Sequence, residues 1–152
     1  MTDPTPENLP EHRSEIRPEI QASVAVAVPR LERSSELELD VTLTNTGSAP
    51  VRLNTLFFPY AQIMLRAEHA DGTPTDSGPP PLPPHDDGHR GRVVLNPGET
   101  LHHVYRGAMY FVNELPPGAY RIRFRYVNHF ADHGDWTGEV ASAWQPFEIV
   151  AP

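Results

Sequence analysis

The segment from Leu115 to Tyr126 constrains the fold more than any other part of the chain. It contains a Pro-Pro-Gly turn, then Tyr120, then an alternation of aromatic or aliphatic residues with arginines. In β-sandwiches, a tyrosine near the start of a late strand donates a hydrogen bond back across the preceding corner. We therefore predict a tyrosine corner at Tyr120. The strand that follows should turn Ile122, Phe124 and Tyr126 toward the core.

Two segments near the N-terminus also alternate with a period of two. The first runs from residue 20 to residue 28 and ends at Pro29, and the second leads into the turn residues Asn45-Thr46-Gly47. The apolar positions are Ile20, Ala22, Val24, Val26 and Val28 in the first segment and Leu37, Leu39, Val41 and Leu43 in the second. Because one face of each segment is apolar, both are predicted to be half-buried strands.

Shorter strands are predicted along the rest of the chain. They span residues 51–58, 63–67, 93–95, 101–105, 140–143 and 147–150, with a less regular apolar segment at 108–112. Turn-forming pairs such as Asp71-Gly72 separate them. Together these segments predict an all-β fold, an antiparallel immunoglobulin-like Greek-key β-sandwich of seven to nine strands.

The length and composition of the chain fit one domain. Its 152 residues provide room for a single core. Residues 1–18 are polar, acidic and interrupted by prolines, whereas residues 72–92 are rich in proline and histidine. We therefore predict a flexible acidic tail over 1–18, a single domain over 19–152, and a long Pro/His-rich loop over 72–92 within it.

Charge and cysteine content narrow the classes of partner and compartment. Twenty acidic residues against twelve arginines give a net charge of −8, which disfavours nucleic acids and anionic membranes as partners. The sequence contains no cysteine, begins without a basic and apolar leader, and has no apolar run of membrane-spanning length. We expect a cytoplasmic protein that binds neither nucleic acid nor membrane.

Three stretches carry a resemblance to a known family. They are residues 37–54 (LELDVTLTNTGSAPVRLN), 95–101 (LNPGETL) and 115–124 (LPPGAYRIRF), accompanied by the Asp71-Gly72 turn. This pattern resembles the bacterial BsuPI-like intracellular proteinase inhibitor family and, more widely, bacterial immunoglobulin-like accessory domains. The resemblance covers about 90 residues, from Leu37 to Tyr126. It implies the sandwich fold and an inhibitory or binding role.

Histidines gather in the predicted loops. His85-Asp86-Asp87-Gly88-His89 lies in the long loop, and His129 and His133 flank Asp132 in the loop after the tyrosine-corner strand. Imidazole and carboxylate groups suit zinc or copper, provided that three or four of them converge. His85, His89, His129 and His133, with Asp87 or Asp132, are therefore candidate metal ligands, and surface histidines without a metal are the alternative. The adjacent His102 and His103 must point to opposite faces of a strand, so at most one of them could join such a site.

Charged ladders are predicted on two strands. Arg121, Arg123 and Arg125 project from one face of the tyrosine-corner strand and could grip a carboxylate or phosphate. The alternative is that they pair with acidic residues across strands. Glu36, Glu38 and Asp40 form an acidic ladder on another strand, and the sequence does not say whether the two strands are neighbours.

No catalytic motif is present. The chain has no Gly-x-Ser-x-Gly elbow, no phosphate-binding loop and no dinucleotide fingerprint, so we predict that it is not an enzyme and has no cofactor. The leading prediction is a non-catalytic module that binds a protein partner through the loops 72–92 and 128–136, with protease inhibition as one such role. The predicted partner-binding residues are His85, Asp86, Asp87, His89, Arg90, Arg121, Arg123, Arg125, His129, His133 and Trp136. A small metal-binding protein and a structural subunit or homodimer are the alternatives.

Overall fold

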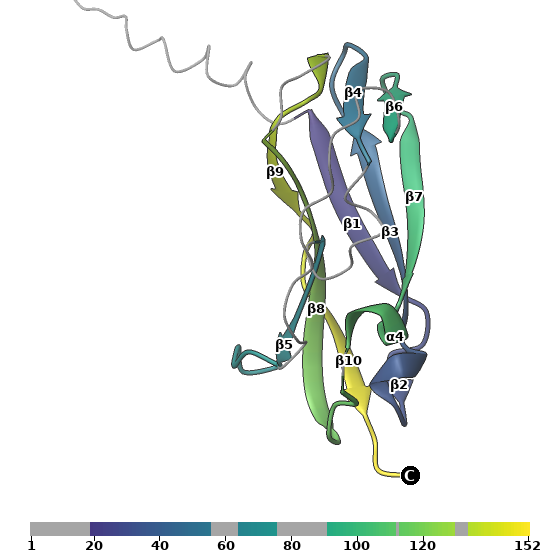
Figure 1. Cartoon of the computed structure of the whole chain (residues 1–152), viewed down its shortest axis with the longest axis vertical. Helices are drawn as coiled ribbons and strands as arrows, with labels where there is room; N and C mark the ends of the chain where they lie inside the picture. The colour runs from purple at the N-terminus through teal and green to yellow at the C-terminus, as the bar shows by residue number, and fades with distance from the viewer. Residues whose placement is uncertain (1–18, 56–63, 76–90, 112, 130–133) are drawn as a thin grey trace, which may run out of the picture.

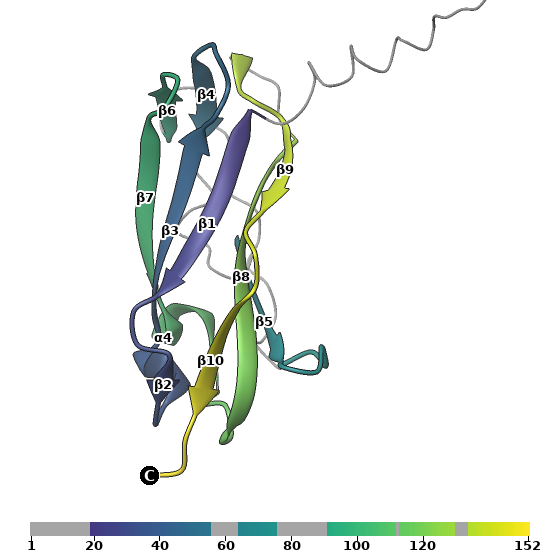
Figure 2. The ribbon, with the colours of Figure 1, turned by 180° about the vertical axis from the view of Figure 1, so that it is seen from behind.

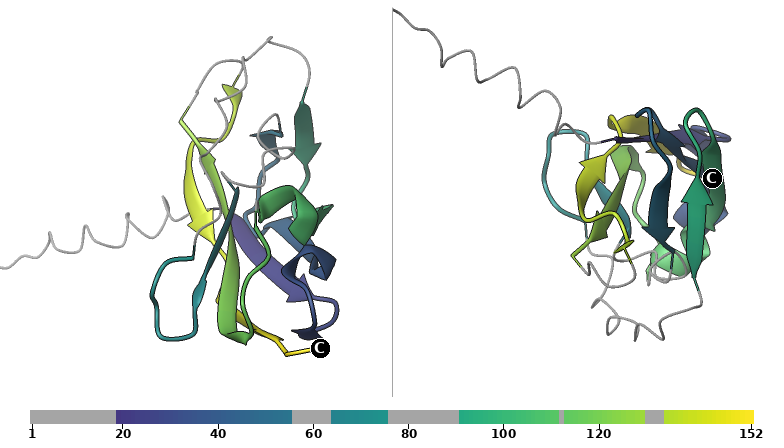
Figure 3. Two further views of the ribbon diagram at one scale, coloured as in Figure 1. Left: turned by 60° about the horizontal axis from the view of Figure 1, so that its bottom comes forward. Right: turned by 90° about the horizontal axis from the view of Figure 1, so that it is seen from above.

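The computed structural model describes residues 19–55, 64–75, 91–111, 113–129 and 134–152. The strands are β1 (Ile20–Val26), β2 (Arg30–Leu31), β3 (Glu38–Asn45), β4 (Val51–Asn54), β5 (Leu65–His69), β6 (Arg92–Leu95), β7 (Thr100–Arg106), β8 (Gly118–Asn128), β9 (Gly138–Ala141) and β10 (Gln145–Ile149). The first sheet has the order β1-β3-β7, and the second has the order β2-β10-β8-β5 with β9 also pairing β8. β4 and β6 form a separate two-stranded ribbon, apart from these two larger sheets. The two sheets face each other, so the predicted all-β sandwich is confirmed (Figures 1 and 3).

The core lies between the two sheets and comes from the alternation seen in the sequence. Leu39, Val41 and Leu43 of β3 are each 1% exposed, and they belong to the same hydrophobic core as Ile122 and Phe124 of β8, which are fully buried. Each such side chain contributes about 1.5–3 kcal/mol by leaving water. β3 lies between β1 and β7 in an antiparallel ladder, which explains why its apolar face is the most completely buried of the three.

The tyrosine corner is confirmed. The hydroxyl of Tyr120 donates a hydrogen bond of 2.6 Å to the carbonyl of Pro116, four residues upstream. The Tyr120 ring is 1% exposed and stacks on Phe147 of β10, with ring centroids 5.5 Å apart. This contact fixes the start of β8, so the register that directs Ile122 inward is set at the corner.

The turn predicted at Asn45 is also present and ties two loops together. The side-chain oxygen of Asn45 accepts a hydrogen bond from the Gly47 amide at 2.8 Å. Its side-chain nitrogen donates to the carbonyls of Ala49 and Leu95, both at 2.8 Å. These bonds join the end of β3 to the two-stranded ribbon formed by β4 and β6. They also satisfy the polar groups of the Asn45 side chain, which is fully buried.

Several predicted boundaries differ from the structure. β1 ends at Val26, and Val28 is 53% exposed rather than part of the apolar face. The segment expected as a strand near 108–112 instead contains the helical turn α4 (Gly107–Tyr110). Gly107 permits this turn because a Cβ at that position would lie 2.0 Å from the Ser34 carbonyl oxygen, in the short 3-10 helix η2 (Ser34–Glu36). β2 pairs with β10 in parallel, so the sandwich is not entirely antiparallel.

The predicted tail and most of the predicted long loop fall on residues that the structure does not describe. At one end of the 72–92 range, Thr73 folds back on β5, where its carbonyl accepts a hydrogen bond from the His69 amide at 2.8 Å. At the other end, Arg92 already belongs to β6. The long loop between these ends and the Greek-key topology stay predictions.

Within the described part of the chain, the helices are too short to cross a membrane.

Candidate functional site

The structure separates the predicted partner-binding residues into three groups. His85, Asp86, Asp87, His89, Arg90 and His133 lie outside the described residues. His129 is exposed just beyond the end of β8, whereas Trp136 packs against the core and its ring lies 5.8 Å from that of Tyr126. Arg121, Arg123 and Arg125 project from the outer face of β8, away from the core, as predicted.

The described residues do not test the metal-site hypothesis. No group of three or more histidine, aspartate or glutamate side chains in them is arranged to hold a metal ion. Of the four candidate histidine ligands, three lie outside the described ranges, so the hypothesis stays a prediction. His102 and His103 point to opposite faces of β7 as expected, with His102 exposed and His103 directed toward Tyr105 at a ring separation of 4.5 Å.

The acidic and basic ladders belong to different sheets. Of the predicted acidic ladder, Glu36 lies in η2 rather than in β3. The other two members find partners on the neighbouring strand β7, where Glu38 lies 3.3 Å from Arg106 and Asp40 lies 3.5 Å from His102. The basic ladder on β8 therefore takes its partners from β5 and β9 instead.

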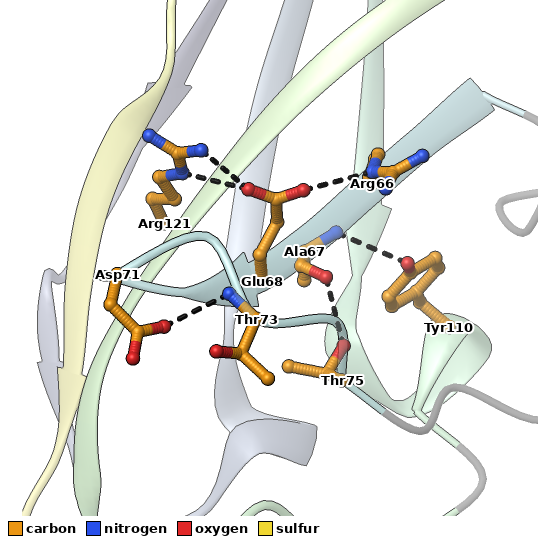
Figure 4. Close-up of polar contacts among 8 residues, drawn as sticks. All are labelled: Arg66, Ala67, Glu68, Asp71, Thr73, Thr75, Tyr110 and Arg121. Carbon is orange, nitrogen blue, oxygen red and sulfur yellow. Dashed lines mark hydrogen bonds and ion pairs between the residues drawn. The ribbon is translucent and has the colours of Figure 1, made fainter.

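Glu68 of β5 is the main acidic partner of the basic ladder. One of its oxygens accepts hydrogen bonds from Nε and Nη2 of Arg121, at 2.9 and 2.5 Å. The other oxygen accepts a hydrogen bond from Nε of Arg66 at 3.1 Å, as Figure 4 shows. The Glu68 side chain is only 6% exposed although it points away from the core, because the two arginines and the turn after β5 cover it.

These contacts stabilise the charged form of Glu68. The hydrogen bonds from Arg121 lower the pKa of the Glu68 carboxyl group below its usual value, and the second arginine adds to the effect. Burial opposes this shift without cancelling it. Glu68 therefore stays ionised at neutral pH and neutralises part of the positive charge on this face.

A β-bulge places Trp144 over the same arginines. β9 pairs Ala141 with Arg125, and β10 pairs Gln145 with Ile122, so three residues of the β9–β10 run face two residues of β8. The extra residue shifts the alternation by one position, which turns Trp144 outward. The guanidinium carbons of Arg121 and Arg123 lie 4.2 and 4.7 Å from the centre of the Trp144 ring, within the range of cation–π attraction.

Arg123 differs from the other arginines of this face. Arg125 forms an ion pair of 3.3 Å with Glu139 of β9, and Arg66 and Arg121 share Glu68. Nε of Arg123 is buried and has no hydrogen-bond partner in the described part of the chain, and no ion pair of Arg123 is found there. Its direct neighbour across the β5–β8 ladder is Arg66, a second positive charge.

We call this surface the Arg–Trp platform and define it as Arg66, Arg121, Arg123, Arg125 and Trp144. Its four arginines face two carboxylates, those of Glu68 and Glu139, so it carries an excess of positive charge in a chain whose net charge is −8. The first residues of the predicted long loop border it, because a Cβ built on Gly72 would lie 3.6 Å from Nη2 of Arg121. The arrangement can bind an anion through guanidinium groups that are already oriented.

Sequence reasoning found the three arginines of β8 and missed Arg66 and Glu68, and it selected Trp136 rather than Trp144 as the partner-binding tryptophan. Arg66 and Glu68 alternate with Leu65 and Ala67, which is a detectable signal for a strand with a charged outer face. Which strand lies beside it could not be read from that pattern. For Trp144, a bulge of one residue leaves no mark on the apolar pattern, so its outward direction could not be predicted.

No protein-family model matches this chain, and no curated protein sequence matches it either.

Proposed function

We propose that the protein is a non-catalytic binding module that holds an acidic segment of a protein partner on the Arg–Trp platform. The observation that carries this proposal is the position of Arg123, a guanidinium group stacked under Trp144 beside a second arginine and without a carboxylate partner in the described residues. A carboxylate can accept two parallel hydrogen bonds from one guanidinium group, and it would supply the missing negative charge.

The composition of the platform supports a protein partner. Arginine and tryptophan are enriched at the energetic centres of protein interfaces, where their contacts with the partner exclude water. The stack on Trp144 also reduces the number of orientations open to the Arg121 and Arg123 side chains before a partner arrives. Less conformational freedom is then lost on binding, which increases the affinity.

The net charge of −8 affects how such a partner is recognised. It repels an acidic partner at long range, so the proposed contact depends on short-range hydrogen bonds and stacking at the platform. Protease inhibition is the narrower role implied by the resemblance, and it would be measured as loss of activity of serine and metalloproteases mixed with the intact protein.

The test uses an acetylated hexaglutamate peptide as the probe and compares two matched arginine variants. Arg123→Gln removes the arginine that carries the proposal, and Arg106→Gln removes an arginine that is paired with Glu38 on the opposite sheet. We expect titration calorimetry to show binding that Arg123→Gln weakens by roughly tenfold or more, as for a central interface arginine. Arg106→Gln should bind like the parent protein. Equal affinities of the parent protein and Arg123→Gln, or no binding of the probe, would contradict the proposal.

A further inference from the structure

β1 leaves one edge of its sheet unpaired. The Thr46 amide donates to the Glu19 carbonyl at 2.8 Å, and the Ala27 amide donates to the Glu38 carbonyl at 3.0 Å, so residues 19 and 27 both direct their backbone groups toward β3. Backbone direction alternates along an antiparallel strand. Ile20, Ala22 and Val24 therefore direct their amides and carbonyls away from β3, where no strand of the described structure pairs with them.

A second free edge lies beside the first. The Ser142 amide donates to the Phe124 carbonyl at 2.8 Å, so the even-numbered residues of β9 direct their backbone groups toward β8. Glu139 and Ala141 consequently direct theirs away from β8, and among the described residues β9 pairs with β8 alone. Figure 2 shows β1 next to the run formed by β9 and β10.

A groove of about 1100 Å³ lies between these edges. We call it the β1 groove. It is lined by residues 19–24, 46–48, 140, 141, 143 and 145. Most of these residues are small and uncharged, and Glu19 is the one charged residue among them. The lining therefore presents few bulky or charged side chains.

The edge of β1 lacks the features that usually prevent strand addition. Natural edge strands carry charged residues, prolines or covering loops. The edge of β5 is covered in this way, because Pro74 forms a bridge with Glu68 and the turn between them folds back on the strand. β1 (IQASVAV) contains no charge and no proline, and its exposed side chains are Gln21, Ser23 and Ala25.

We propose that the β1 groove accepts an extended segment of a protein partner as an additional β-strand. Main-chain hydrogen bonds to Ala22 and Val24 would supply affinity, as in other cases of β-strand addition. The charge of the lining determines which segment can bind. Because Glu19 is its one charged residue, we expect the bound segment to be uncharged along its middle and to place a basic residue near Glu19. A second copy of the chain is disfavoured because two chains of charge −8 repel each other. This proposal is independent of the Arg–Trp platform.

The test measures amide hydrogen exchange with a defined probe, an amidated peptide of about eight residues that alternates threonine and valine and begins with arginine, long enough to span β1. Saturating peptide is expected to slow exchange at the amides of Ala22 and Val24 by roughly tenfold or more. The amides of Gln21 and Ser23, which already bond to β3, should change little. Unchanged exchange at Ala22 and Val24 would overturn the proposal.

Two proline variants provide matched controls. Ala22→Pro removes a donor from the free edge without removing a hydrogen bond to β3, and proline is tolerated at such positions. Val104→Pro likewise removes a donor from the outer edge of β7. The Gly107 amide donates to the Leu37 carbonyl and the Glu99 carbonyl accepts from the Asn45 amide, so the odd-numbered residues of β7 direct their backbone groups toward β3 and Val104 directs its own away. We expect Ala22→Pro to abolish peptide binding and Val104→Pro to preserve it, with folding of both checked by thermal unfolding. If Ala22→Pro does not fold, the exchange measurement on the parent protein decides alone.

Two other outcomes would assign the groove to a different occupant and overturn the proposal. Light scattering that shows a dimer in which Ala22 and Val24 are already protected would assign the edge to a second copy. Protection in the isolated monomer that disappears when residues 1–18 are deleted would assign it to the chain's own N-terminal segment.

Discussion

Ser142 acts as both the acceptor and the donor for the backbone of Phe124. Its amide donates to the Phe124 carbonyl at 2.8 Å, and its side-chain hydroxyl accepts a hydrogen bond from the Phe124 amide at 2.9 Å. The hydroxyl therefore replaces the Ser142 carbonyl, which a regular ladder would use. Because the hydroxyl serves as the acceptor in place of the carbonyl, β9 continues into β10 across the bulge, and Trp144 is turned toward Arg121 and Arg123.

Removing that hydroxyl should destabilise the protein. In Ser142→Ala the buried Phe124 amide loses its acceptor, which we expect to cost about 1–3 kcal/mol of unfolding free energy. Urea unfolding followed by circular dichroism measures this cost, with the exposed Ser23→Ala as a control that should change stability by less than about 0.5 kcal/mol. A stability of Ser142→Ala equal to that of the control would show that the hydroxyl does not hold the bulge.

The ion pair between Arg92 and Asp135 should contribute more to the free energy of unfolding than the Ser142 hydroxyl does. Nη2 of Arg92 lies 2.9 Å from one oxygen of Asp135, and the two side chains are 3% and 0% exposed. Asp135→Asn removes the charge of a buried carboxylate that pairs with Arg92 and lies 3.6 Å from Arg52, so we expect a loss of about 3–5 kcal/mol. The exposed pair of Arg30 and Glu148 gives a control, because Glu148→Gln should cost less than about 1 kcal/mol. Similar losses in thermal unfolding experiments on the two variants would contradict this ranking.

The hydroxyl groups of Tyr120 and Tyr126 should differ in their contribution to stability. Tyr120→Phe removes one hydrogen bond to Pro116 and should cost about 0.5–1.5 kcal/mol. The Tyr126 hydroxyl accepts from the Asn54 amide at 3.1 Å and donates to the Asn54 carbonyl at 2.8 Å. Tyr126→Phe should therefore cost more than Tyr120→Phe in chemical unfolding, because it removes two buried bonds. The reverse order would mean that the corner contributes more than this bond count indicates.

The stability contributed by Glu68 should depend on pH. Arg121 and Arg66 lower the pKa of Glu68 in the folded protein, so its contribution is complete above the unfolded-state value near 4.5 and is lost as pH falls through the lower folded-state pKa. The difference in unfolding free energy between the parent protein and Glu68→Gln should therefore shrink below about pH 4.5 and stay constant from pH 5 to 7. A difference that does not change with pH would contradict the assignment of Glu68 as an ionised partner of these arginines.

Local sequence pattern predicted the sandwich because strand alternation and the tyrosine corner are encoded within short segments. The side chains of β3 that point into the core and the hydrogen bond from Tyr120 both follow from residues that are close in sequence. Predictions failed where the conformation of a segment depended on tertiary contacts. Gly107 begins a helical turn because it lies against Ser34, more than seventy residues earlier, and no local pattern reports that contact.

The candidate site was predicted only in part, because only some of its features are encoded within one strand. The arginines of β8 were found from alternation within one strand, whereas their partners come from two other segments. The pairing of Arg121 with Glu68 and the stack of Arg123 on Trp144 depend on strand order and on the bulge. Both properties are set by the whole sheet, so a single sequence did not reveal them.

The most direct test of the account is a nuclear magnetic resonance titration of the arginine side-chain Nε–H groups and the tryptophan indole N–H groups with acetylated hexaglutamate. Nε of Arg123 is buried, so its proton should exchange slowly enough with water to be observed. We predict that the signals of Arg123 and Trp144 shift with increasing peptide, while the signal of Arg106 on the opposite sheet does not. Shifts at Arg106 equal to those at Arg123, or no shift at the platform, would contradict its assignment as the binding surface.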